Sequence, residues 1–181
     1  MPGSTFQTNP IGLLKILDEC QQGLVQLPDF QRSWVWDEDR IKGLIASVSR
    51  AFPVGALMSL ETGGETNFKP RPVEGAPATA AATAPLSLLL DGQQRVTSLY
   101  QVALRGKVVE TVAAKKKRVK RWFYLDIRKA LDPAVDREEA IIGVPEDRVV
   151  RSEFGREVLL DLSTPAKEYA ALMYPVSQVF D

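Results

Sequence analysis

The sequence predicts a mixed fold of the α/β class (α+β mixed), in which helices flank a small sheet. Three observations predict it. Apolar residues recur at helical spacing in two early segments, 13–20 and 41–48. Short apolar or aromatic runs without that spacing, at 86–90 and 122–127, are typical of strands. The first of these runs leads through a glycine turn directly into a third helical pattern, which makes a strand–turn–helix unit.

Composition bounds the kind of protein. The chain has 181 residues, the length of one ordinary domain, and 45% of them are hydrophobic, enough for one core. It has no histidine, which excludes Ser-His-Asp and Cys-His nucleophilic sites and His-ligated metals. The single cysteine, Cys20, excludes disulfide frameworks, and a reducing cytoplasm is the default location. No apolar run approaches the roughly 20 residues of a membrane span.

The first third of the chain reads as two helices and two strands. We expect residues 1–8 to be disordered, and Asn9 and Pro10 to start a helix that ends at Gly23. This helix places Cys20 in the core. Residues 25–28 are expected to be extended, and residues 54–60 to form a strand. Between them Asp37 caps a second helix, whose buried stripe is Ile41, Leu44, Ile45 and Val48.

Residues 69–85 mark a change in composition, since they include four prolines and six alanines. Such a segment has almost nothing to bury, so we interpret it as a flexible insertion within a single domain at 9–181. Beyond it, the sequence predicts a strand at 122–127, a short helix from Pro165 and a strand at 174–179. The last residues stop in the middle of a pattern, so we expect the chain to be the front part of a longer protein.

The turn after the apolar run at 86–90 has residues suited to phosphate chemistry. The first N–H groups of a helix attract anions, and Gly92 lets the backbone approach a ligand. Arg95 supplies a forked donor for phosphate oxygens, and Asp91 is placed to hold a hard cation or to orient a water. Gln93 and Gln94 can position a nucleophilic water or a base. Alternatively, Asp91 is simply a helix cap.

A second polar cluster lies among large apolar side chains. Asp29, Gln31 and Arg32 are surrounded in sequence by Phe30 and by the tryptophans at 34 and 36. Burying polar groups among large apolar side chains costs free energy unless the polar groups are paired or line a site. The structural alternative is an Asp–Arg ion pair beside two core tryptophans.

A basic segment is embedded in a chain with 23 basic and 23 acidic residues. Its members are Lys115, Lys116, Lys117, Arg118, Lys120 and Arg121. The stretch 132–161 is acidic by contrast. This segregation indicates a DNA-facing patch, an internal pairing of the two segments or a solvated hairpin tip. As a DNA patch it would supply affinity without sequence information.

Three blocks in this order resemble a known family. The segments "LPDFQRSWVW", "IKGLIASVSRAFPVG" and "LLLDGQQRVTSLY" are similar to the N-terminal domain of GmrSD-type modification-dependent restriction proteins, and most similar to its phosphorothioate-sensing SspE-type members. The resemblance covers residues 10–105 and extends to 122–127. It implies a ParB/sulfiredoxin-like fold that binds and hydrolyses nucleoside triphosphate, in proteins that cut modified DNA with a separate C-terminal nuclease domain.

The resemblance therefore implies a regulatory NTPase that uses GTP or ATP with Mg²⁺ and senses modified double-stranded DNA. The expected catalytic residues are Asp91, which also binds the metal, and Gln93, Gln94 and Arg95. The expected nucleotide-binding residues are Gly92, Arg95, Thr97, Asp29, Gln31 and Arg32. The expected DNA-binding residues are Phe30, Gln31, Arg32, Trp34 and the six basic residues of 115–121. The alternative is a ParB-like nucleotide- and DNA-binding switch without significant turnover. The other expected partner is the nuclease domain of the same protein; a homo-oligomer is an open alternative, and no membrane is expected.

Overall fold

The computed structural model describes residues 7–64, 68–113, 117–152 and 155–181. Its first sheet has the strand order β2-β4-β1-β3. The strands are β1 (Val25–Pro28), β2 (Met58–Glu61), β3 (Pro70–Arg71) and β4 (Ser87–Asp91). The two central strands, β1 and β4, are parallel, whereas β2 and β3 pair with them antiparallel. The carboxyl ends of β1 and β4 therefore meet at one edge of this sheet.

The second sheet is built around one long strand. It pairs antiparallel with three others, and a separate two-stranded hairpin follows. The long strand is β6 (Arg118–Asp126), and its neighbours are β5 (Val109–Val112), β7 (Ile141–Pro145) and β10 (Met173–Pro175). The hairpin consists of β8 (Val149–Arg151) and β9 (Val158–Asp161).

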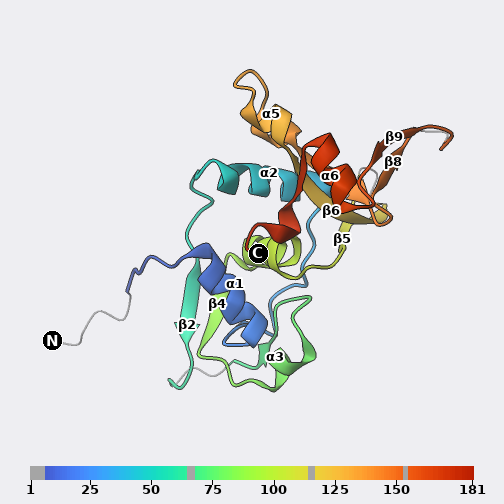
Figure 1. Cartoon of the computed structure of the whole chain (residues 1–181). Coiled ribbons are helices and arrows are strands. Elements are labelled where there is room, and N and C mark those ends of the chain that lie inside the picture. Colours follow the sequence, from blue (N-terminus) through green and yellow to red (C-terminus); the bar gives the residue numbers. More distant parts are fainter. Residues whose placement is uncertain (1–6, 65–67, 114–116, 153–154) are drawn as a thin grey trace.

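Helices of different lengths connect and cover the sheets. The longer ones are α1 (Leu13–Gln22), α2 (Glu38–Ser49) and the combined helix of α4 (Gln93–Leu99) and the π-helix η1 (Tyr100–Leu104). The shorter ones are α3 (Ala78–Ala82), α5 (Ile127–Leu131), η3 (Arg137–Ala140), α6 (Pro165–Ala171) and η4 (Val176–Gln178). In Figure 1, α1, β2, β4 and α3 lie together in the lower part, and α5, α6, β5 and β6 lie in the upper part.

Each sheet has its own hydrophobic core, and two helices contribute to both. The first core includes Leu44 of α2 with Val96 and Leu99 of α4. The second includes Ile41 and Ile45 of α2, and Val102 and Ala103 of η1. The helix at 93–104 therefore runs from one core into the other. The mixed arrangement of helices and sheets confirms the predicted fold class.

The capping predictions have mixed outcomes. Gly23 ends α1 in the left-handed conformation, with φ 78°, as predicted. The start was predicted wrongly: α1 begins at Leu13 after the cap residue Gly12, so Asn9 does not cap it. Asp37 caps α2 as predicted, and its carboxylate accepts a hydrogen bond from the Arg40 N–H at 2.8 Å. Cys20 is fully buried, which confirms its place in the core, and burial raises the pKa of its thiol to about 12.

Three strand predictions need different corrections. The strand predicted at 54–60 is found only at 58–61, because the carbonyls just before it bind an arginine side chain. The strand predicted at 174–179 stops at Pro175, where η4 begins. The aromatic strand predicted at 122–127 is found as part of β6, which starts earlier, at Arg118, and ends at Asp126, because Ile127 begins α5. The short helix α6 starts at Pro165 after the cap residue Thr164, as predicted.

The interpretation of residues 69–85 as a segment with almost nothing to bury is wrong. It contains β3 and α3, and within it Val73 is 2% exposed and Ala80 fully buried. The amide of the buried Gln26 in β1 donates hydrogen bonds to the Ala80 carbonyl at 3.0 Å and to the Thr83 carbonyl at 2.9 Å. The segment is thus fastened to the first sheet by a side chain whose partners lie more than fifty residues away.

The sequence predicts a disordered N-terminus and no membrane-spanning segment. Of residues 1–8, predicted to be disordered, residues 1–6 lie outside the described part of the chain, and residues 7 and 8 are exposed and have no regular secondary structure. Within the described ranges, no helix is long and apolar enough to cross a membrane.

Candidate functional site

The turn at 91–95 lies at the carboxyl end of β4, where α4 begins. Gly92 has φ 89° and precedes the first residue of the helix. This left-handed conformation favours glycine, and a Cβ atom here would also displace the Leu57 side chain. As at the start of any helix, the first N–H groups of α4 have no partner within the helix. The turn thus combines a tight backbone with donors that have no partner within the helix.

Two carboxylates follow the two parallel strands at the same sheet edge. Val25 pairs with Ser87, and Gln26 with Leu88. Asp29 is the first residue after β1, and Asp91 is the last residue of β4, so both lie where the parallel strands end. Both residues are exposed, and the Asp91 side chain keeps 72% of its surface accessible. The structure therefore brings these two predicted site residues to one edge.

The Arg95 guanidinium is already engaged in hydrogen bonds within the protein. Its guanidinium donates hydrogen bonds to the Val54 carbonyl and, at 2.8 Å, to the Ala56 carbonyl, and it lies 3.4 Å from the Asp91 carboxylate. Gly55 between the two carbonyls has φ 93°, and a Cβ atom there would lie 2.3 Å from Nη1 of Arg95. The side chain of Arg95 therefore anchors the segment before β2 and sits beside the one carboxylate of the turn.

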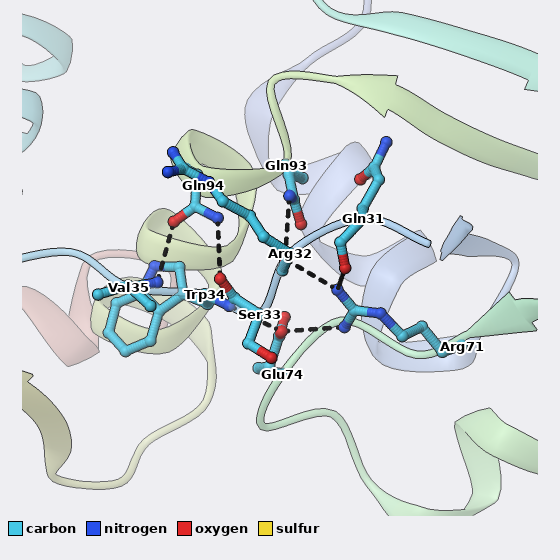
Figure 2. Close-up of polar contacts among 9 residues, drawn as sticks. All are labelled: Gln31, Arg32, Ser33, Trp34, Val35, Arg71, Glu74, Gln93 and Gln94. Atoms are coloured by element: carbon cyan, nitrogen blue, oxygen red, sulfur yellow. Dashed lines mark hydrogen bonds and ion pairs between the residues drawn. The ribbon is translucent and has the colours of Figure 1, made fainter. Parts of the chain in front are cut away.

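The two glutamines of the turn hold the segment at 29–36 against α4, as Figure 2 shows. The Gln94 amide accepts a hydrogen bond from the Val35 N–H at 3.0 Å and donates one to the Ser33 carbonyl at 3.3 Å. The Gln93 amide donates to the Arg32 carbonyl at 3.1 Å. The two predicted clusters are thus one structural unit, joined by side-chain amides.

Gln31, from the 29–36 segment, binds the end of β4 in turn. Its amide donates to the Leu89 and Leu90 carbonyls at 2.9 and 2.8 Å, at the end of β4. Because carbonyls only accept, these bonds fix which end of the amide faces β4. The Oε1 atoms of Gln31 and Gln93 are both buried and have no hydrogen-bond partner within the described part of the chain.

Arg71 and Glu74, from the segment at 69–85, complete this unit (Figure 2). Arg71 donates to the Gln31 and Arg32 carbonyls at 3.1 and 3.2 Å. Glu74 accepts the Trp34 N–H at 2.9 Å and binds Arg71 at 2.9 Å. Sequence reasoning missed both residues; the only signal was a pair of opposite charges inside a proline- and alanine-rich stretch. The backbone of 31–35 is therefore held by side chains from two other segments.

Phe30 and Arg32 are exposed residues of this segment, as are Asp29, Ser33 and Val35. Phe30 is 65% exposed and contacts Phe68 edge to face, with ring centroids 5.1 Å apart. Trp34 is partly buried, and its indole N–H donates to Ser98 at 2.9 Å, so much of its ring is inside. The alternative ion pair between Asp29 and Arg32 is not formed within the described ranges.

Thr97 does not lie on the surface of the turn. It is 1% exposed, and its hydroxyl has no hydrogen-bond partner among the residues that the structure covers. The structure therefore places this predicted nucleotide-binding residue inside the packing of α4 and not on the outer face of the turn.

The basic segment divides into parts with different surroundings. Lys115 and Lys116 lie outside the described residues. Lys117 is exposed just before β6. Arg118, Lys120 and Arg121 belong to β6 itself, so the hairpin-tip interpretation is wrong for these three.

Two of the basic side chains in β6 are paired within the protein. Lys120 lies 2.9 Å from Glu146, which confirms one internal contact between the basic segment and the acidic stretch at 132–161. Arg121 lies 3.0 Å from Glu38 of α2, and its side chain is 22% exposed. Arg121 thus joins α2 to the second sheet, which leaves Arg118 and Lys117 as the more accessible cations here.

Comparisons with known proteins agree with the sequence blocks. A family model described as "GmrSD restriction endonuclease, N-terminal domain" matches residues 13–161. An uncharacterized protein of Methanocaldococcus jannaschii is 30% identical over 129 residues. The match covers 68% of this chain and 21% of that protein, so the chain spans about a fifth of the length of this relative. No solved structure matches the chain.

Proposed function

Because the chain belongs to the family of GmrSD restriction endonuclease N-terminal domains, we propose that it is the NTP-hydrolysing, modified-DNA-sensing domain of a restriction protein. The observation that supports this most is the joining of the 91–95 turn to the 29–36 segment by Gln93 and Gln94. This joining leaves Asp91, Asp29 and Arg32 exposed around one sheet edge.

The exposed carboxylates fit a hard cation. Within the described residues no cluster of three or more metal-ligating side chains is found, so we do not propose a metal cage made of protein ligands alone. Mg²⁺ is commonly held by one or two carboxylates, with water and substrate phosphates completing its shell. Asp91 and Asp29 suit that mode, and a cation held there would neutralise phosphate charge. Arg95, 3.4 Å from the Asp91 carboxylate, restrains its position.

The remaining groups of this edge would bind and orient the nucleotide. The free N–H groups at the start of α4 and the Arg32 guanidinium supply positive potential for phosphate oxygens. The site has no histidine or other strong base, so hydrolysis relies on positioning and electrostatics and is expected to be slow.

DNA sensing is assigned to the outer side of the 29–36 segment. There Phe30, 65% exposed, lies next to the exposed Arg32 in sequence. The cation would hold a backbone phosphate, and the aromatic ring would favour a modified group that is less hydrated than an ordinary one. The partners in this proposal are modified double-stranded DNA and a C-terminal nuclease domain of the same protein.

One observation favours a second function, a nucleotide- and DNA-binding switch without significant turnover. The Arg95 guanidinium and both turn amides are engaged with backbone groups of neighbouring segments. These hydrogen bonds hold the 29–36 and 54–56 segments in place. A ligand that competed for the same side chains would free both segments together.

The test is phosphate release from GTP and ATP with Mg²⁺, measured with and without plain and modified duplexes. Asp91→Asn should melt like the wild type, because its side chain is 72% exposed, and should lose more than tenfold of the release. Asp39→Asn is a matched control, since this aspartate is 83% exposed on α2. Nucleotide binding without release in the wild type would favour the switch. Absence of both binding and release would contradict the proposal.

A further inference from the structure

A groove of about 780 Å³ is lined by the 34–36 segment, by η1 and by the β5–β6 hairpin. Trp34 and Trp36 are among its lining residues. None of the residues of the turn lines it. The groove is therefore a separate feature of the molecule, although it shares the 29–36 segment with the candidate site.

A side-chain amide without a protein partner lines the groove. It belongs to Gln101, which is 4% exposed and makes no side-chain hydrogen bond with other described residues. Its amide atoms are not fully enclosed, so a ligand or water in the groove can reach them. Gln101 belongs to η1, and π-helical turns are rare and frequent at functional sites.

Arg105 lies one helical turn beyond Gln101 and lines the same groove. Its guanidinium donates to the Val108 carbonyl, whereas its Nε atom is buried without a partner in the described part of the chain. Gly75, with φ 92°, lies directly against it: a Cβ atom there would be 2.8 Å from Nη1. Burial lowers the pKa of Arg105, but the group stays charged because arginine is so strongly basic.

The rim of the groove is cationic. Besides Arg105, it includes Lys107, Arg118 and Lys120, and only two acidic side chains, Glu74 and Glu110, line the groove. Glu74 is paired with Arg71 and Lys120 with Glu146, both partners lying outside the groove lining. Arg105, Lys107 and Arg118 are then left against Glu110. The lining thus combines two tryptophans, an amide without a protein partner among the described residues, and an excess of positive charge.

We propose that this groove binds one nucleotide of a DNA strand. The base would lie against the two tryptophans, where stacking stabilises any base, and Gln101 would contact its polar edge with one donor and one acceptor. The cationic rim would bind the adjoining phosphates. Because a base inside a duplex is not accessible to such a groove, the bound nucleotide is extrahelical. The inference rests on the proposed DNA sensing, and a free nucleotide shares the same chemistry.

The test uses a duplex with one extrahelical 2-aminopurine and the same duplex fully paired. The wild type should bind the first at least tenfold more tightly and change its fluorescence. Gln101→Met keeps the length of the side chain but removes its donor and acceptor, so it should abolish most of the preference and leave binding of the paired duplex unchanged. Gln22→Met, at an exposed position of α1, is the matched control and should change neither.

Arg118→Ala provides a second variant in case Gln101→Met does not fold. It should weaken both duplexes together and reduce the salt dependence of binding, because it removes a phosphate contact. Equal binding of the two duplexes by the wild type would overturn the proposal. So would a Gln101→Met protein that folds and keeps the preference.

A titration with AMP and GMP separates the two sources of nucleotide. If these bind in a Gln101-dependent way while DNA binding ignores Gln101, the assignment to DNA is overturned. Suppose that a folded Gln101→Met protein keeps its preference for the extrahelical base and that its phosphate release still responds to DNA. That result would refute the groove as the binding site and leave the proposed function standing. Gln101-dependent binding without any release in the wild type would instead refute hydrolysis and leave the groove standing.

Discussion

The contact of Arg95 with the segment before β2 makes a strong prediction about stability. The guanidinium donates to the Val54 and Ala56 carbonyls, and its side chain is only 21% exposed. Hydrogen bonds to charged groups contribute roughly 1.5–3 kcal/mol each, and part of this is regained by water at a partly exposed site. Arg95→Met should therefore lower the free energy of unfolding by about 2–4 kcal/mol.

Gly55→Ala disturbs the same contact from the other side. Its Cβ atom would lie 2.3 Å from Nη1 of Arg95, and the residue has φ 93°. The backbone conformation alone costs an alanine about 1 kcal/mol, and displacement of the guanidinium adds to this. In an Arg95→Met background only the backbone cost is left. The two substitutions should therefore be less than additive, by about 1–2 kcal/mol.

Urea unfolding of the wild type, both single variants and the double variant measures this coupling. Gly63→Ala is the matched control, because this glycine has φ 92° and a Cβ atom added there would meet no described residue within 4 Å, so the substitution carries mainly the backbone cost. Additive effects of Gly55→Ala and Arg95→Met, or an Arg95→Met protein as stable as the wild type, would refute the anchoring role of Arg95.

Two further predictions concern other contacts. Gln94→Met removes the hydrogen bonds to Val35 and Ser33, so it should lower the free energy of unfolding by about 1 kcal/mol and speed hydrogen exchange at the Val35 amide. Unchanged exchange would contradict the role of Gln94 in holding the 29–36 segment against α4. Hydrogen bonds from Lys167, at 2.6 Å, and from Ser163 lower the pKa of Asp161 below its ordinary value. Its contribution is thus present above about pH 4 and lost as the pH falls through the folded-state pKa, so the melting-temperature deficit of Asp161→Asn should be largest near pH 7 and should shrink towards pH 2.

The parts of the fold that depend on local sequence were predictable. The cap residue Asp37 and the buried residues Ile41, Leu44 and Ile45 are where the helical spacing places them, because the cap and the stripe depend on residues within one or two turns. The Gly92 turn was equally readable, since a buried strand, a glycine and a helix are consecutive in the chain.

The parts that depend on distant partners were not predictable. Composition indicated nothing to bury at 69–85, but Ala80 is covered by α1 and β1, and Arg71 and Glu74 hold a backbone about forty residues away. The side chain of Arg95 was equally misleading. Its type suits phosphate, and only the path of the chain at 54–56 shows that it already binds two carbonyls.

The continuous helix at 93–104 has a mechanical consequence. Val96 and Leu99 are packed in the first core, and Val102 and Ala103 in the second. A movement of one end of this helix is therefore transmitted to the other end. Its first residues form the 91–95 turn, and Gln101 lies in the groove. A rotation or shift of the turn of even an ångström must therefore repack both cores or move Gln101 with it. If ligands bind both the proposed site at the sheet edge and the proposed site in the groove, this shared helix would couple them, and by thermodynamic reciprocity each ligand should alter the affinity of the other to the same extent.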